Sequence, residues 1–179
     1  TDISALKFKL DFQLNFKNFV IVFLFLLIAI NSFLKNSSIL IAEFDTSYNH
    51  VKIYAIDDFN HLNSDDAGRQ IQILQMNAVT HSGMFTDNIN DLVFRYTKYY
   101  RLAEHFKQDF RNTLMLGGGA FSFPKYFLEN YSSSTIDVVE IDPMVTQAAF
   151  EYFGLKEDER LNIIDQDARV FMNQTDDTY

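Results

Sequence analysis

The second half of the sequence predicts an α/β fold built on a parallel sheet. Three short apolar segments, residues 112–116, 135–139 and 161–164, alternate with two stretches of helical periodicity. Three glycines follow the first segment and an acidic residue, Glu140, follows the second. Strands and helices that alternate at this spacing are typical of a doubly wound sheet. We therefore assign residues 111–179 to the first half of a Rossmann-like domain.

The helices of this half are bounded by residues that start or stop helices. Ser122 is predicted to cap the helix after the glycines, with Pro124 tolerated in its first turn. Asp142 is a good N-cap for the next helix, Pro143 suits its first position, and Gly154 stops it. One face of that helix carries the predicted buried stripe, which is Val145, Ala148, Ala149, Tyr152 and Phe153.

Upstream, alternating residues predict a small antiparallel β-hairpin layer over residues 39–83. Its two strands are residues 51–56 and 69–76, and a polar loop joins them. The segment 84–110 is predicted to connect the two parts through a helix at 91–105. The apolar face of this helix is expected to carry Leu92, Tyr96, Tyr99 and Leu102.

The N-terminal segment, residues 1–38, contains a predicted hydrophobic helix at 19–34. No charge or proline interrupts this run, and a helix over it would be about 24 Å long, a little less than the ~30 Å hydrocarbon core of a bilayer. We expect a transmembrane helix. A signal peptide, since lysines precede the run, and a buried core helix are the alternatives.

Charge and composition exclude several kinds of chemistry. The net charge is -9, and the 15 basic residues are scattered, so we expect no binding to nucleic acid. The absence of cysteine excludes disulfides, thiolate catalysis and cysteine-based zinc sites. His50, His61 and His105 show no metal-ligand spacing, and we expect no metal. The acidic balance suits a cationic substrate.

Polar features at the strand ends predict a nucleoside site. Gly117, Gly118 and Gly119 would let a ligand approach the backbone closely, beside the free N–H groups of the next helix. Glu140, about twenty residues on, is placed to accept hydrogen bonds from two ribose hydroxyls. Asp167, after the third strand, is placed to accept one from an adenine amino group. The glycines lack the G-x-G-x-x-G spacing and no lysine is present for phosphates, which favours a nucleoside without pyrophosphate over NAD.

Several of these motifs occur together in one family. The segments are Leu114–Gly119, Val138–Pro143, Asp158–Leu161 and Asp167–Ala168. Together they are similar to the polyamine aminopropyltransferases, or spermidine synthases. Residues 46–51 resemble the family's Ser-x-Tyr entry into its amino-terminal hairpin, and 76–84 with 92–97 look most like its membrane-fused branch. The resemblance covers roughly residues 43–179, and the block 140–143 is its most specific part.

The resemblance implies a Rossmann-like sheet of the class I methyltransferase type and a site for S-adenosylmethionine or its decarboxylated form. In the complete protein it implies aminopropyl transfer to a polyamine. Gly117, Gly119 and Glu140 would hold the nucleoside, with Glu140 on the ribose and Asp167 on the adenine. Tyr48 and Tyr96 would shape the amine side of the cleft.

Three departures from the family pattern leave other functions open. Ala120 stands where the family usually has an acidic residue that contacts the aminopropyl group, and His81 stands where it has a glutamine. His81 is either a base or adenine-stacking group at the cofactor site, or a polar residue of the hairpin. The family's catalytic aspartate would lie beyond Tyr179, so the catalytic residue of this chain is unknown. A methyltransferase-like enzyme and a non-catalytic nucleoside-binding or accessory module are the alternatives.

The ends of the sequence and its lysines bear on context. The chain starts at Thr1 and stops at Tyr179 without closing structure, so we expect a fragment of a longer protein. Lysines before the hydrophobic run favour a cytoplasmic amino terminus, which would place the rest outside. Adenosyl donors are made in the cytoplasm, however, and we therefore expect a membrane protein whose Rossmann-like domain is cytoplasmic. Candidate partners are a polyamine, the membrane and a second copy of the chain in a homodimer.

Overall fold

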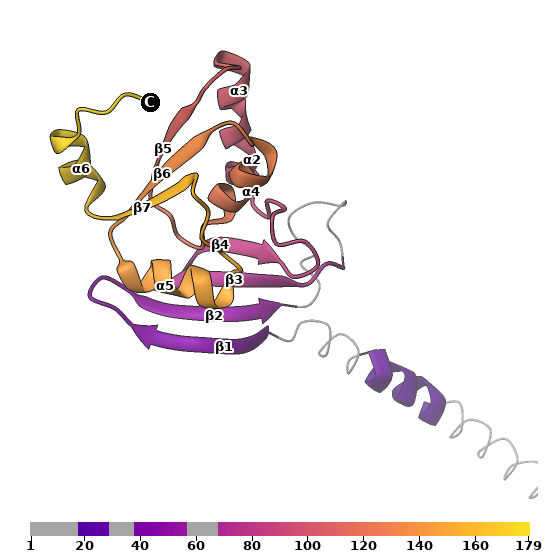
Figure 1. Cartoon of the computed structure of the whole chain (residues 1–179). Coiled ribbons are helices and arrows are strands. Elements are labelled where there is room, and N and C mark those ends of the chain that lie inside the picture. Colours follow the sequence, from indigo (N-terminus) through magenta and orange to yellow (C-terminus); the bar gives the residue numbers. More distant parts are fainter. Residues whose placement is uncertain (1–17, 29–37, 57–67) are drawn as a thin grey trace, which may run out of the picture. The chain divides into compact units, whose positions relative to one another are not determined.

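The computed structural model describes three parts of the chain, residues 18–28, 38–56 and 68–179 (Figure 1). The chain divides into two compact units, residues 1–37 and 38–179. The second unit contains every residue predicted to bind a nucleoside or an amine.

In the first unit, residues 18–28 are helical, and the rings of Phe19 and Phe23 stack with their centroids 6.3 Å apart. Within the parts of the chain that the structure describes, no helix is both long enough and apolar enough to cross a membrane. The end of the predicted run at 19–34 lies outside those residues. The transmembrane helix therefore stays a prediction.

The second unit begins with a four-stranded antiparallel sheet in the order β1-β2-β3-β4. The strands are β1 (Ser38–Asp45), β2 (His50–Ile56), β3 (Ile71–Met76) and β4 (Val79–Phe85). The two predicted strands correspond to β2 and β3, which pair as expected. A tight turn at Asn77 and Ala78, both with positive φ, joins β3 to β4. The predicted two-stranded layer was thus too small by two strands.

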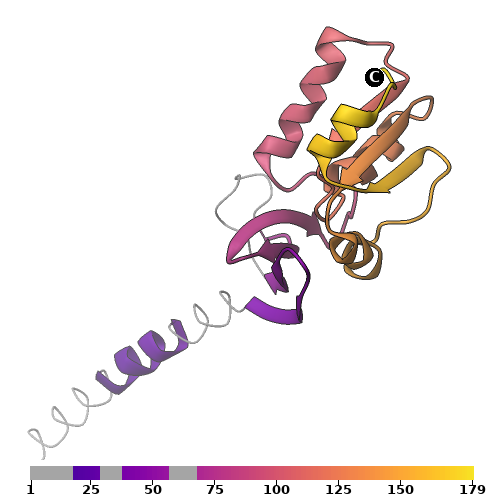
Figure 2. The same cartoon turned by 90° about the vertical axis from the view of Figure 1, so that its left-hand side faces the viewer.

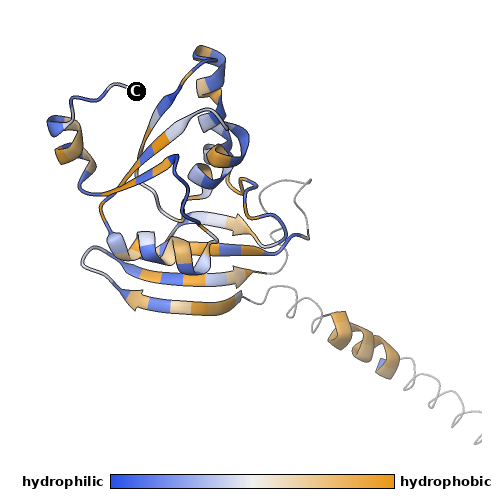
Figure 3. Ribbon diagram, viewed as in Figure 1, coloured by the Kyte–Doolittle hydropathy of each residue, from blue (hydrophilic) through white to orange (hydrophobic). Residues whose placement is uncertain are grey.

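The missed strands lack the pattern that identified the others. In β1, consecutive apolar residues replace the alternation, and Ile39, Leu40 and Ile41 are all exposed at this edge of the sheet. In β4, Thr80, His81, Ser82 and Gly83 interrupt the apolar residues. Figure 3 shows striped hydropathy along β2, the pattern on which the sequence prediction depended.

A three-stranded parallel sheet follows in the order β5-β6-β7, as predicted. Its strands are β5 (Asn112–Leu116), β6 (Thr135–Glu140) and β7 (Leu161–Asp165). Leu116 pairs with Val139, and Glu140 with Asp165, so all three strands end at one edge. This edge carries the predicted site.

The helices α5 (Pro143–Tyr152) and α6 (Ala168–Gln174) both begin at an aspartate. Asp142 accepts a hydrogen bond from the backbone N–H of Met144, which confirms it as an N-cap. Gly154, with φ of +67°, follows the end of α5 as predicted.

Two helix predictions were wrong at their N-termini. The connecting helix consists of α2 (Arg95–Tyr99), η2 (Tyr100–Leu102) and α3 (Ala103–Phe106), and so starts four residues later than predicted. Leu92 instead forms an isolated bridge with Met84 and is buried, whereas Tyr96, Tyr99 and Leu102 are exposed. The predicted apolar face therefore does not form.

Ser122 does not cap α4 (Ser122–Asn130). It is the first helical residue, and Phe121, in the left-handed region at φ of +53°, precedes it. The Ser122 hydroxyl donates instead to the carbonyl of Gly83, 2.9 Å away. The helix thus uses its first polar side chain to contact β4.

Helix α5 joins the two sheets (Figures 1 and 2). Val145 and Ala148 pack with Val51, Ile53 and Leu74 of the antiparallel sheet. On its other side, α5 contributes Ala149 to a second core with α4 and the parallel sheet. Because the same helix belongs to both cores, the antiparallel sheet is held against the carboxyl edge of the parallel one.

Candidate functional site

The glycine bend after β5 is braced by the side chain of Glu140. One carboxylate oxygen, Oε2, accepts hydrogen bonds from the backbone N–H groups of Gly118 and Gly119, at 2.8 and 3.0 Å. The other, Oε1, accepts from the N–H of Asp142 at 3.1 Å. Glu140 is 8% exposed, so its charge is held by three backbone amides. The strand-end carboxylate therefore meets the bend through backbone amides, and its predicted contact with two ribose hydroxyls stays a prediction.

The three glycines occupy different surroundings. A Cβ on Gly117, where φ is +88°, would meet no heavy atom within 4 Å, so the bend is open on this side. A Cβ on Gly118 would lie 2.5 Å from the ring of Phe121, and one on Gly119 would lie 2.6 Å from Ser82 Oγ. The bend is thus backed by Phe121 and β4, and a ligand would have to approach it beside Gly117.

Strand β4 forms the second support of the bend. The backbone N–H of Ala120 donates to Ser82 Oγ at 3.1 Å, and Ser82 is buried. Ala120 itself is fully buried in the core shared with the antiparallel sheet. The position that departs from the family pattern is therefore filled by a small apolar side chain that presents no charge to the bend.

Asp167 lies at the same edge and caps α6. Its Oδ1 accepts from the backbone N–H groups of Arg169 and Val170, at 2.7 and 3.1 Å. The side chain is exposed. The structure assigns Oδ1 to the helix, and the predicted contact with adenine stays a prediction.

The predicted amine-side tyrosines come from two separate elements. Tyr48 lies in the β1–β2 turn and is 53% exposed. Tyr96 is the second residue of α2, and its hydroxyl donates to the carbonyl of His81 at 2.5 Å. Partial burial raises the pKa of Tyr96. His81 is exposed, and its backbone carbonyl rather than its ring makes this contact.

Three residues that shape the bend were not identified from the sequence as site residues. Ser82 and Phe121 touch the glycines, and Asp142, which was predicted only as a helix cap, also donates its N–H to Glu140. The signal for Asp142 was its place in the Glu-Ile-Asp-Pro block. For Ser82 no local pattern exists, because it reaches the bend from 38 residues away.

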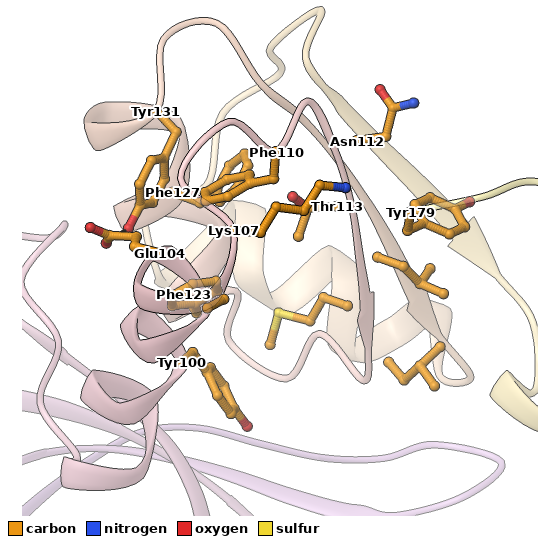
Figure 4. Close-up of a pocket in the computed structure, with 14 residues that line it drawn as sticks. Tyr100, Glu104, Lys107, Phe110, Asn112, Thr113, Phe123, Phe127, Tyr131 and Tyr179 are labelled. Carbon is orange, nitrogen blue, oxygen red and sulfur yellow. Dashed lines mark hydrogen bonds between the residues drawn. The ribbon is translucent and has the colours of Figure 1, made fainter.

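An apolar groove lies along β5 and is lined by residues other than these groups (Figure 4). Its volume is about 470 Å³. Side chains of β5 line it together with Tyr100 and Glu104 of the connecting helix, Phe123 and Phe127 of α4, and Tyr131. The Tyr131 hydroxyl donates to Glu104. Neither Glu140 nor the three glycines line this groove.

Metal ligands are not grouped in the described residues. Across 18–28, 38–56 and 68–179, no three His, Asp or Glu side chains are arranged to hold a metal ion. His50 forms ion pairs instead, with Asp45 through Nδ1 at 2.6 Å and with Glu43 through Nε2 at 2.9 Å. Those contacts raise the pKa of His50, chiefly through the hydrogen bond with Asp45.

Two curated proteins are similar to the chain in sequence. It is 25% identical over 156 residues to the polyamine aminopropyltransferase of Vibrio vulnificus (strain CMCP6), covering 87% of this chain and 50% of that protein. It is 38% identical over 76 residues to the polyamine aminopropyltransferase of Lachnospira eligens, covering 40% of this chain and 26% of that protein. The chain thus spans at most about half the length of these relatives. No family model matches it.

Solved spermidine synthases share the fold of the second unit. A probable spermidine synthase from Corynebacterium glutamicum superposes with a TM-score of 0.59 at 22% identity, covering 74% of this chain and 47% of that one. The spermidine synthase of Thermotoga maritima gives a TM-score of 0.56 at 15% identity, covering 75% and 42%. A spermidine synthase in complex with the transition-state analogue AdoDATO gives 0.55 at 15% identity, covering 75% and 43%. Together with the sequence relatives, these structures confirm the resemblance of this chain to the spermidine synthase, or polyamine aminopropyltransferase, family.

Proposed function

We propose that this chain binds the nucleoside of S-adenosylmethionine or of decarboxylated S-adenosylmethionine at the glycine bend. In the complete protein, this site would serve aminopropyl transfer to a polyamine. The curated relatives are named for that transfer, and one structural neighbour of the same fold was solved with a transition-state analogue.

The observation that carries the proposal is the contact between Glu140 and the glycine bend. A carboxylate at the end of β6 holds the bend after β5 in one conformation, with open space beside Gly117. Among the described residues, Oε1 accepts one N–H, that of Asp142, and so retains capacity for a ligand hydroxyl. The bend also lacks a lysine for phosphates, which agrees with a nucleoside that carries no pyrophosphate.

Ala120 favours a second candidate. Its side chain is fully buried and neutral, so it offers no partner for the positive aminopropyl group of the decarboxylated donor. The alternative is therefore a protein that binds S-adenosylmethionine itself, either for methyl transfer or without turnover. Both candidates use the same bend and differ in the donor that they prefer.

Calorimetric titration separates these candidates. The chain is titrated with S-adenosylmethionine, its decarboxylated form and methylthioadenosine. A preference for the decarboxylated donor supports aminopropyl transfer, and a preference for S-adenosylmethionine supports the second candidate. Absence of binding by all three would contradict both. Glu129→Gln, on the exposed side of α4, is the matched control for Glu140→Gln, which we expect to weaken binding by roughly tenfold or more.

The cellular setting of the site is part of the proposal. We place the domain in the cytoplasm, where adenosyl donors are made, with the hydrophobic segment at the membrane and a homodimer as a candidate assembly. Because the chain has no cysteine, Ser133→Cys introduces a single labelling site, in the exposed loop between α4 and β6. In intact cells, a membrane-impermeant maleimide should leave it unlabelled until the membrane is opened. Labelling of intact cells would contradict this placement.

A further inference from the structure

The β1–β2 turn, which carries Tyr48, is fastened to the first turn of α5 (Figure 1). The hydroxyl of Thr46 donates to Asp142 Oδ2 at 2.5 Å, and the side-chain amide of Asn49 donates to the same oxygen at 3.2 Å. Asp142 is 1% exposed, and it lies 96 residues from Thr46 in the sequence. We call Thr46, Asn49 and Asp142 the turn clamp.

Inside the turn, Thr46 fixes the position of Tyr48. Its Oγ1 accepts hydrogen bonds from the backbone N–H groups of Tyr48 and Asn49, at 3.0 and 2.8 Å. The single hydroxyl hydrogen has two acceptors within reach, Asp142 Oδ2 at 2.5 Å and the carbonyl of Asn49 at 3.2 Å, and the shorter contact with the carboxylate is the stronger one. The hydroxyl of Thr46 therefore links the backbone N–H of Tyr48 to the carboxylate of Asp142.

The same aspartate is linked to the glycine bend through Glu140, by two hydrogen bonds in series. Its N–H donates to Glu140, and Glu140 accepts from Gly118 and Gly119. Its Oδ1 accepts from Met144 at 3.2 Å, so the two carboxylate oxygens serve different elements. Oδ1 caps α5, and Oδ2 holds the turn. Capping alone needs only one of them.

We propose that Asp142 is a positioning residue that sets Tyr48 at a fixed place relative to the glycine bend. This inference rests on the proposed function, because it assigns the Tyr48 turn to the amine side of the nucleoside site. Asp142 is almost fully buried, so it would act through Thr46 and Asn49 rather than by touching a ligand. A buried carboxylate that accepts hydrogen bonds from two elements fixes the position of one element relative to the other more tightly than apolar packing alone.

Two variants separate the clamp from the cap. Asp142→Asn retains an oxygen for Met144, and asparagine is as good an N-cap as aspartate, but its amide nitrogen cannot accept from Thr46 and Asn49. Thr46→Val removes the turn's hydroxyl and leaves the cap intact. Ser134→Ala is the control, since it removes a buried hydroxyl that donates to the carbonyl of Phe110 at 2.9 Å, just before β6 and at the opposite end of the strand from the bend.

The affinities are measured by calorimetry on the full chain, with methylthioadenosine as the nucleoside probe and spermidine as the amine probe. We expect both clamp variants to weaken spermidine binding by about tenfold, which is about 1.4 kcal/mol, and to change methylthioadenosine binding by less than about threefold. A purely structural role would lower the melting temperature without this split. Equal losses for both probes, or none for spermidine, would overturn the inference.

Amide hydrogen exchange tests the clamp without any ligand. In Asp142→Asn, the amides of Tyr48 and Asn49 should exchange faster than in the wild type, while those of Gly118 and Gly119 keep their protection. Unchanged exchange at Tyr48 and Asn49 would refute the clamp. If the wild type binds neither probe, the proposed function fails, and the clamp is then decided by this exchange experiment alone.

Discussion

The glycine bend and the groove along β5 are adjacent in the sequence, yet their chemistry differs. At the bend, the amides of Gly118 and Gly119 converge on one buried carboxylate. The groove has a volume of about 470 Å³, and aromatic and aliphatic side chains make up most of its lining. Two polar residues of the lining, Tyr131 and Glu104, form a hydrogen bond with each other.

The apolar cavity and the convergent polar groups of this molecule therefore lie in different regions, the cavity along β5 and the polar groups at the bend. A ligand site usually combines an apolar cavity with a few convergent polar groups. Here the convergent groups lie at the carboxyl ends of the strands, where ligands bind in open α/β sheets. The groove instead follows β5, which has a neighbour on one side only among the described strands.

Removing the brace should have the largest effect. Glu140→Ala leaves three N–H groups without their acceptor, and we expect the free energy of unfolding to fall by about 2–4 kcal/mol, measured by urea denaturation. The exposed Glu129→Ala is the control and should change it by less than about 0.5 kcal/mol. A similar small change for Glu140→Ala would mean that the bend does not depend on this carboxylate.

The two outer glycines should differ in a way that reports on β4. Gly119→Ala forces an alanine into the left-handed region and places its Cβ 2.6 Å from Ser82 Oγ, whereas Gly117→Ala meets only the backbone strain. We expect losses of about 2–3 and about 1 kcal/mol respectively in the free energy of unfolding. Equal losses for the two variants would show that Ser82 does not clash with a side chain at position 119. In that case, adding Ser82→Ala to Gly119→Ala should leave the free energy of unfolding unchanged.

Local sequence signals recovered the parts of this architecture that depend on local physics. Alternation identified β2 and β3, short apolar runs identified the parallel strands, and the Asp-Pro pair identified the start of α5. Glu140 was placed correctly at a strand end beside the glycines. Its specific partners could not be predicted, because the direction of a side chain depends on the packing of the bend and of Phe121.

Contacts between distant segments account for most of what was missed. The hydroxyl of Thr46 meets Asp142 across 96 residues, and Ser82 meets Ala120 across 38, and no periodicity encodes either pairing. Ser122 was wrongly predicted as a cap because its neighbour Phe121 adopts the left-handed conformation. Strand β1 was missed because it begins with three consecutive apolar residues, Ile39–Ile41, which are exposed on both faces of this edge strand and so show no alternation.

The buried side chain of Lys125 reports on the packing between α4 and α5, the two helices that flank the bend. Its ammonium group is buried and donates to the carbonyl of Phe153 at the end of α5, and burial lowers the pKa of Lys125 to about 8. The unfolded chain holds this proton up to pH ~10.5, so between about pH 8 and pH 10.5 it binds more protons than the folded one. The contribution of Lys125 to stability should therefore rise with pH by at most about 1.4 kcal/mol per unit.

The measurement compares the wild type with Lys125→Met, since other groups titrate in the same range. The melting temperature of the wild type should rise relative to that of Lys125→Met as the pH increases from 7.5 to 10. A difference that stays flat across this range would show that the lysine keeps its ordinary pKa. It would also mean that α4 and α5 leave room for water beside it.

The smallest effect is expected in the groove. Thr113→Glu introduces a charge on its β5 wall, and we expect the dissociation constant for methylthioadenosine to change by less than about twofold, measured by calorimetry. The matched variant at the bend is Gly117→Glu, at the open side, which should abolish measurable binding. Loss of binding in Thr113→Glu alone would move the nucleoside into the groove and reverse the comparison.

The most direct test maps where a nucleoside touches the folded chain. Backbone amide shifts in ¹⁵N-labelled protein are followed as methylthioadenosine is added. We expect the largest changes at Gly117–Gly119, Glu140 and Asp167, with little change at Tyr100 and Thr113. Changes confined to the groove residues, or no change at the bend at saturating ligand, would contradict this expectation.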